Sequence, residues 1–234
     1  MENVKLSPRL KAVASFVPYG CVPADVGTDH GYLPISLIKS GWIKRAVASD
    51  IKEGPLCSAK LTAKRYEVED RIDFVLTDGL HGTEDRKYDT AVMAGMGGET
   101  IVKIISEAPF LKQKVSCLIL QPQSKIEVLR GYLSGNGWST EDECLVRDSG
   151  RLYDVIKLVF TGEGEVFSPA ELYTGRKLFE NRSPLLAEYV EELTEKFEKQ
   201  RSGLEMAEST DETSMENVRA VLNGLRNMRE EITW

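Results

Sequence analysis

The sequence predicts an open, mostly parallel α/β sheet that is followed by a small helical unit. Short apolar runs that stop at Gly, Asp or Pro alternate five times with stretches of helical periodicity, as parallel strands and crossover helices do. After this alternation, strand-like runs disappear and apolar residues recur only at three- and four-residue spacing. We therefore divide the chain into a sheet domain over residues 1–162 and a C-terminal helical domain over residues 163–234.

The sheet domain begins with a helix, because Ser7 and Pro8 are typical of an N-cap and a first helical position. The elements expected after it are strand 21–26, helix 33–40, strand 46–50, helix 55–66, strand 72–76, strand 90–94, helix 99–105 and strand 117–120. Pro122 is expected to end the last of these strands, and residues 124–127 have the form of a capping box that opens another helix. Strands 138–146 and 153–160 with a turn between them predict a terminal β-hairpin, whose last strand is antiparallel.

The C-terminal segment predicts two amphipathic helices. Ser168-Pro169-Ala170-Glu171 is a second capping box. Apolar residues then recur at helical spacing over residues 185–204 and 218–228, and the polar stretch 209–214 separates the two runs. We expect an antiparallel, coiled-coil-like helical hairpin.

Composition and charge exclude several classes of protein. With 41% hydrophobic and 29% charged residues, the chain is neither disordered nor of low complexity. It has no apolar run long enough to span a membrane and no secretory leader, which predicts a cytoplasmic protein without a membrane partner. Its four cysteines contain no C-x-x-C pair, so we expect neither a disulfide framework nor a metal site.

The net charge of −7 arises entirely from the C-terminal segment. Residues 161–234 contain 16 Asp and Glu against 9 Lys and Arg, whereas the first 160 residues are balanced. A nucleic-acid-binding surface is therefore compatible with the sheet domain despite the acidic total. Its candidate basic residues are Lys5, Arg9, Lys11, Lys39, Lys44 and Arg45.

Residues 25–32, Asp-Val-Gly-Thr-Asp-His-Gly-Tyr, form the most informative loop. An acid that closes a strand, a glycine and a polar turn before a helix are typical of a nucleotide-type binding loop. The dinucleotide pattern G-x-G-x-x-G is absent, and Asp25 and Asp29 would repel a pyrophosphate. Both carboxylates favour a ligand with a cationic centre, such as S-adenosylmethionine (SAM) with its sulfonium and ammonium groups.

Other strand ends agree with this interpretation. Asp50 is placed to accept hydrogen bonds from two ribose hydroxyls, Asp78-Gly79 to bind the adenine amino group, and the small loop after residue 93 to let a substrate approach. The predicted cofactor-binding residues are Asp25, Gly27, Thr28, His30, Gly31, Asp50, Ile51, Asp78, Gly79, Ala94, Gly95 and Met96.

Three segments of the chain resemble the TrmK family of bacterial tRNA (adenine-22-N1)-methyltransferases. They are ADVGTDHGYLPI (24–35), AGMGGETI (94–101) and LILQPQ (118–123). The resemblance covers essentially the whole chain and implies a Rossmann-like class I SAM-dependent methyltransferase with a helical C-terminal extension. It further implies methyl transfer from SAM to N1 of an adenine in tRNA. At Asp29 and His30 the chain departs from the general class I pattern, a departure that TrmK-like proteins share.

Methylation of adenine N1 needs no general base, because this nitrogen has a free lone pair at neutral pH. The enzyme has to orient the base, exclude water and tolerate the positive charge that develops on it. Asp29 is the predicted catalytic carboxylate, unless it only caps the following helix. Tyr32 is predicted to stack on the adenine, or else to pack in the core, and Gln121 to bind the target base, or else to be a strand-end polar residue.

Two other functions remain open at this stage. The same loops would suit a SAM-dependent methyltransferase that acts on rRNA, a protein or a small molecule. They would also suit a non-catalytic SAM-binding module whose helical hairpin contacts a partner. Nothing in the sequence distinguishes a monomer from a homodimer.

Overall fold

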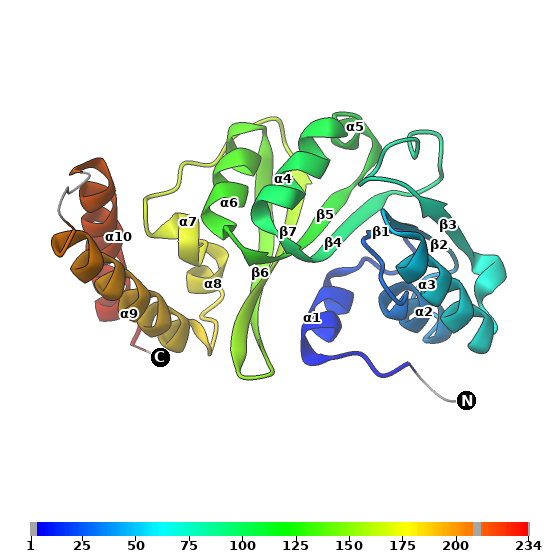
Figure 1. The fold of residues 1–234 in the computed structure, drawn as a ribbon, viewed down its shortest axis with the longest axis horizontal. Helices are drawn as coiled ribbons and strands as arrows, with labels where there is room; N and C mark the ends of the chain where they lie inside the picture. The colour runs from blue at the N-terminus through cyan, green and yellow to red at the C-terminus, as the bar shows by residue number, and fades with distance from the viewer. Residues whose placement is uncertain (1–3, 208–211, 234) are drawn as a thin grey trace.

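One seven-stranded sheet forms the centre of the molecule, as the computed structural model shows for residues 4–207 and 212–233 (Figure 1). Its strand order is β3-β2-β1-β4-β5-β7-β6. The strands are β1 (Pro23–Val26), β2 (Ala46–Asp50), β3 (Ile72–Leu76), β4 (Thr90–Gly97), β5 (Cys117–Ser124), β6 (Trp138–Asp148) and β7 (Arg151–Phe160). Strands β1 to β5 are parallel, and β7 runs antiparallel to both of its neighbours, as predicted.

Helices cover both faces of the sheet. They are α1 (Pro8–Phe16), α2 (Tyr32–Lys39), α3 (Glu53–Arg65), η1 (Glu69–Arg71), α4 (Gly98–Glu107), α5 (Leu111–Lys114) and α6 (Ile126–Gly135). Consecutive residues of β4 divide between two apolar clusters, since Val92 packs with side chains of α1 and α2 and Met93 with those of α4 and α6. This two-sided burial is why the strands read as continuous apolar runs. The predicted fold class is confirmed.

The sheet reverses its direction of growth between β1 and β4. From β1 the chain proceeds to β2 and β3 on one side, and from β4 it proceeds to β5 on the other. Val26 lies beside Met93 in the parallel pair, so the loops that follow these two strands leave the same sheet edge next to each other. In open α/β sheets such a switch point is where ligands bind.

Two local predictions were wrong. Strand β5 continues through Pro122 to Ser124, because beyond Leu120 it no longer pairs with β7 and a proline is tolerated where a strand has one neighbour. Ser124 does not cap α6; Lys125 occupies the N-cap position with a φ of 55° and without a side-chain cap bond. By contrast, the Ser7 hydroxyl caps α1 as expected and accepts from the N–H of Leu10 at 3.3 Å.

The C-terminal segment forms α7 (Glu171–Thr174), α8 (Lys177–Glu180), α9 (Leu186–Glu205) and α10 (Glu212–Glu231). The two long helices lie side by side (Figure 1) and pack through one apolar cluster, as predicted. The capping box is present, since the Ser168 N–H donates to Glu171 at 2.8 Å and the Glu171 N–H to Ser168 at 3.3 Å. Part of the predicted polar break lies outside the described residues. Leu145 of β6 belongs to the same cluster, and the domain boundary after residue 162 stays a prediction.

A buried charge cluster connects this segment to the sheet. The Arg130 side chain, only 2% exposed, donates to the Glu143 carboxylate at 2.6 Å and to the Asp154 carboxylate. Its remaining nitrogen donates to the carbonyl oxygens of Leu172 and Tyr173 at 3.1 and 3.0 Å. One guanidinium therefore joins α6, β6 and β7 to the backbone at α7.

The second oxygen of Glu143 extends the same connection. It accepts a hydrogen bond from the backbone N–H of Lys177 at 3.2 Å. A Cβ at Gly175, whose φ is 71°, would lie 2.1 Å from that oxygen, so only glycine fits there. No helix within 4–207 or 212–233 has an apolar stretch that could cross a membrane.

Candidate active site

The loop after β1 is a tight turn held by backbone hydrogen bonds. The N–H groups of Gly27 and Thr28 both donate to the carbonyl oxygen of Ser49 in β2, at 2.8 and 2.9 Å. Gly27 has a φ of 70°, and a Cβ on it would lie 2.3 Å from the Met96 methyl group. The positive φ of the turn favours glycine at this position, and the absence of a side chain leaves room for the Met96 methyl group.

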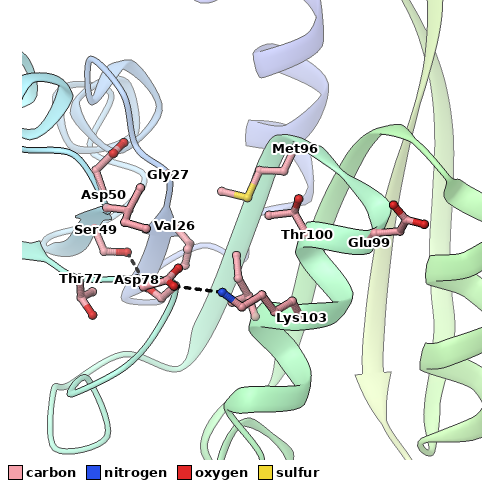
Figure 2. A pocket seen from close by; sticks show the side chains of 13 residues that line it. Val26, Gly27, Ser49, Asp50, Thr77, Asp78, Met96, Glu99, Thr100 and Lys103 are labelled. Atoms are coloured by element: carbon pink, nitrogen blue, oxygen red, sulfur yellow. Dashed lines mark hydrogen bonds and ion pairs between the residues drawn. The ribbon is translucent and has the colours of Figure 1, made fainter.

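A first cavity of about 500 Å³ opens at the carboxyl ends of β1, β2 and β3, with α4 on its other side (Figure 2). This volume lies within the usual range for small-molecule sites. Its lining includes the predicted cofactor-binding residues Gly27, Asp50, Ile51, Asp78, Gly79 and Met96. It also includes residues that were not predicted from the sequence, namely Val26, Ser49, Thr77, Glu99, Thr100, Lys103 and Ile104.

Asp50 links two loops of this cavity. One carboxylate oxygen accepts from the N–H of Lys52 at 2.9 Å and the other from the N–H of Asp29 at 3.3 Å. These bonds to the loops after β2 and β1 fix the carboxylate at the cavity wall. Such a fixed acceptor suits neighbouring hydroxyl groups of a ligand.

Asp78 faces Lys103 across the cavity, and Figure 2 shows their ion pair, which is 3.1 Å long. The Ser49 hydroxyl donates to the carbonyl oxygen of Gly79 at 3.3 Å and holds the same loop. Lys103 lies on α4, one turn beyond Glu99 and Thr100, which also line the cavity. In the sequence, these three polar residues follow the glycine-rich loop at helical spacing, and that pattern could have indicated them.

A second cavity, of about 300 Å³, shares Gly27 with the first. The predicted residues Asp25, Thr28, Asp29, His30, Tyr32, Ala94 and Gly95 line it, together with Arg9, Leu10, Leu33 and Gln123. Gly31 lines neither cavity; its missing side chain lets α2 approach Ala59 of α3, 3.2 Å from the position of a Cβ. The predicted site residues thus divide into two adjoining hollows.

Asp25 is a buried acid that lines the second hollow. Its carboxylate accepts a 2.6 Å hydrogen bond from the Thr28 hydroxyl. Burial raises the pKa of Asp25 to about 6; the Thr28 bond opposes this rise, and the negative charge of Asp50 adds to it. Such a carboxyl group is poised to ionise when a cation arrives beside it.

Asp29, His30 and Tyr32 form the outer wall of the second cavity. The Asp29 carboxylate is 70% exposed and lies 3.7 Å from the His30 ring nitrogen. The rings of His30 and Tyr32 stack at a centroid distance of 5.4 Å, and Tyr32 is 42% exposed, so it is not a core residue. The capping alternative for Asp29 is wrong, because Gly31 is the N-cap of α2 and no side chain caps this helix.

Gln121 lies behind the second cavity. It is fully buried, its amide oxygen accepts from Arg9 at 2.7 Å and from the N–H of Gly95 at 3.0 Å, and its amide nitrogen donates to Pro122 at 2.9 Å. The predicted contact with a target base has no support in this geometry. Gln121 instead positions Arg9 and the loop that follows β4.

Comparison with known proteins assigns the family. Residues 6–156 match the family described as methyltransferase domain. The tRNA (adenine(22)-N(1))-methyltransferase of Bacillus subtilis (strain 168) is 33% identical over 156 residues, which cover 67% of this chain and 66% of that protein. A putative tRNA methyltransferase of Mycoplasma genitalium is 31% identical over 154 residues, covering 65% of this chain and 67% of the relative. The matched segment thus spans about two thirds of these relatives.

Solved structures match almost the whole chain. A Streptococcus pneumoniae protein, described as a putative tRNA (m1A22) methyltransferase, has a TM-score of 0.85 at 28% identity and covers 96% of this chain and 100% of its own. The B. subtilis m1A22 tRNA methyltransferase TrmK has a TM-score of 0.85 at 25% identity, with coverages of 97% and 100%. The fold, the switch-point cavities and the family match define a methyltransferase-domain protein. The chain belongs to the TrmK family, as its three motifs indicated.

Proposed function

We propose that this protein transfers the methyl group of SAM to N1 of an adenine in tRNA, at position 22. The observation that carries the proposal is the pair of adjoining cavities that share Gly27, one suited to a cofactor and the other to a base. The relatives support the reaction: the B. subtilis protein is named for adenine 22, and the S. pneumoniae protein was solved with S-adenosyl-L-methionine at 29% identity and a TM-score of 0.80.

The first cavity fits a cationic nucleoside cofactor. Asp50 offers two carboxylate oxygens for ribose hydroxyls, and Asp78 lies where an exocyclic amino group would bind. Asp25, which lines the adjoining second cavity two residues before the shared Gly27, supplies a further carboxylate. The lining also contains apolar surface from Val26, Met96 and Ile104 against which an adenine ring can pack. When bound, SAM supplies an electrophilic methyl group on a sulfonium.

The second cavity provides what the acceptor base requires. Adenine N1 attacks through its own lone pair, so no side chain has to remove a proton first. A positive charge then develops on the ring, and Asp29 supplies a carboxylate beside it. The stacked pair of His30 and Tyr32 offers a π-face that holds an unstacked base in place.

The target adenine has to leave its stack before it can enter this cavity. Extrusion of a nucleotide costs a few kcal/mol and is easiest where the RNA is weakly paired. Contacts to the phosphate backbone supply the affinity that offsets this cost and make binding salt-dependent. We expect the reaction to occur in the cytoplasm on tRNA that lacks the modification.

Incubation with methyl-labelled SAM and unmodified bacterial tRNA tests the proposal. After digestion to nucleosides, the label is expected in 1-methyladenosine. Asp29→Asn removes the charge and keeps a residue that tolerates the positive φ of 52° at this position. We expect it to lower kcat by about 10²-fold with little change in SAM affinity, as loss of one preorganised electrostatic partner does.

Asp70→Asn is the matched control, since Asp70 is an exposed acid in η1, away from both cavities. It is expected to retain full activity. Label in another nucleoside, or none despite SAM binding, would contradict the proposed acceptor.

A further inference from the structure

Arg9 differs from the other basic residues of α1. Lys11 is exposed on the surface of this helix, whereas Arg9 is half-buried and lines the second cavity. Among the described residues that line this cavity, Arg9 is the only permanently charged cation. The sequence analysis assigned Arg9 and Lys11 to one basic surface, and the structure separates them.

The position of Arg9 is set by buried groups. One terminal nitrogen donates to the amide oxygen of Gln121 at 2.7 Å, and the guanidinium lies 5.8 Å from the centre of the Tyr153 ring. The Arg9 backbone N–H donates to Asp148 at the tip of the β6–β7 hairpin, at 3.3 Å. Because Gln121 is fully buried and also accepts from Gly95, it cannot turn away without breaking two bonds.

The loop after β4 leaves room for this side chain. Gly95 has a φ of 82°, and a Cβ on it would lie 3.2 Å from the Arg9 guanidinium nitrogen. A side chain at position 95 would be strained at this φ and would require the Arg9 guanidinium to shift by a few tenths of an ångström. The glycine, the buried amide and the guanidinium form one arrangement at the cavity wall.

Arg9 retains unused hydrogen-bond donors. No carboxylate lies within ion-pair distance of its guanidinium in the described part of the chain, and only one of its two terminal nitrogens has a protein acceptor there. The Arg9 guanidinium is bound by a neutral amide, so no salt bridge has to break before it binds an anion, and its charge also acts on nearby Asp148. Its planar donors match two oxygens of a phosphate, which is the usual partner of such a group in RNA-binding proteins.

Two carboxylates line the same cavity. Asp25 is the third residue of β1 and Asp29 lies in the loop that follows this strand, where the methylated base would become cationic. A nucleotide combines a base with an anionic backbone group, and a cavity lined by one guanidinium and two carboxylates has a partner for each part. The arrangement therefore fits a whole nucleotide rather than a base alone.

We propose that Arg9, positioned by Gln121, is a phosphodiester-binding site that holds the backbone of the target nucleotide while its base lies in the second cavity. The assignment rests on the proposed function, since it takes the ligand to be RNA. Arg9 acts on the acceptor and not on the cofactor.

Binding and kinetics of Arg9→Gln, Arg9→Lys and Lys11→Gln test the assignment. Arg9→Gln is expected to raise the Kd for tRNA about tenfold or more and to reduce the salt slope of binding by about one, with SAM affinity within twofold of wild type. Arg9→Lys keeps the charge, so it should retain the slope while losing part of the affinity. A rise in the Kd for SAM at unchanged tRNA binding would overturn the assignment.

Replacement of one charged phosphodiester of the RNA by an uncharged linkage tests which phosphate Arg9 contacts. A tRNA assembled with one uncharged methylphosphonate at the target nucleotide is expected to bind wild type and Lys11→Gln more weakly than normal tRNA. Arg9→Gln should bind the two RNAs equally, because its contact is already lost. Equal sensitivity of Arg9→Gln and wild type to the neutral linkage would contradict the proposal.

The two hypotheses fail in different ways. If the wild-type protein binds tRNA but transfers no methyl group to it, the proposed function fails, and the binding comparison still tests Arg9. If the wild type methylates tRNA and Arg9→Gln matches it in Kd and KM, only the phosphodiester site fails.

Discussion

Two groups of acidic side chains in this molecule have contrasting surroundings. Glu143 and Asp154 are buried around the guanidinium of Arg130, which contacts both. Asp25, Asp29 and Asp50 surround the two cavities, and none of them has a Lys or Arg partner in the described ranges. The first group is paired with a cation of the chain itself, Arg130. The second group gains a cationic partner only when a ligand binds.

The contrast distinguishes charged groups that stabilise the fold from charged groups that are available to bind a ligand. A buried ion pair costs desolvation, which its partners recover only through close geometry and further hydrogen bonds. Arg130 has both, and it also bonds two carbonyl groups of the C-terminal segment. Asp25 has only a hydroxyl partner, and burial raises its pKa to about 6.

The largest expected effect comes from breaking the buried group. Arg130→Met leaves Glu143 and Asp154 buried without their partner, which should reduce the free energy of unfolding by about 3–5 kcal/mol. Urea denaturation followed by circular dichroism measures the loss. The triple variant Arg130→Met, Glu143→Gln, Asp154→Asn removes all three charges and should recover part of it. A single variant as stable as wild type would show that the cluster is not structural.

Titration of Asp25 should have an intermediate effect. Its pKa of about 6 lies above the value of an unfolded chain, so between about pH 4 and 6 the folded protein holds the extra proton. Stability without ligand therefore falls as pH rises through this window, and affinity for a cationic cofactor rises. SAM binding by calorimetry should weaken up to about tenfold per pH unit below 6. Asp25→Asn should bind SAM more weakly at pH 7 and without this pH dependence, whereas a pH dependence like that of wild type would exclude Asp25.

The smallest effect is expected for Lys103, which forms an ion pair with Asp78 across the mouth of the first cavity. Exposed ion pairs contribute little, so the cofactor displaces this one easily. Lys103→Met is expected to raise SAM affinity by a factor of about 2 to 5, measured at low salt. The exposed Lys199→Met on α9 controls for net charge. Weaker SAM binding by Lys103→Met would mean that Lys103 contacts the cofactor itself.

Local sequence patterns predicted most of the sheet. Strands β2 and β3 have the bounds predicted from their sequence, although only β2 is buried along its whole length and β3, at the sheet edge, is partly exposed. The helices α5 and α8 were not expected, since four residues are too few to show helical periodicity, whereas the start of α7 was marked by its capping box. The end of β5 was misplaced because the effect of Pro122 depends on which strands pair with that stretch, and pairing is not a local property.

The residues of the candidate site also fall into those that the sequence predicts and those that it does not. The carboxylates and glycines at the strand ends could be predicted because each belongs to a short motif at a predictable sheet edge. Lys103 and the location of Arg9 in the cavity could not, since they meet Asp78 and Gln121 from 25 and 112 residues away. Gln121 was singled out for a contact with the base, and only the fold shows its amide facing Arg9 instead.

Strand β6 also fixes the distance between two points at which other segments of the chain are bonded to it. Glu143 bonds the backbone at Lys177, and Asp148, five residues further along the same strand, bonds the backbone of Arg9. The strand between them is regular and paired throughout, which separates the two anchor points by about 17 Å. The paired strand thus keeps the backbone before α8 at a constant distance from α1, which carries the Arg9 side chain of the second cavity.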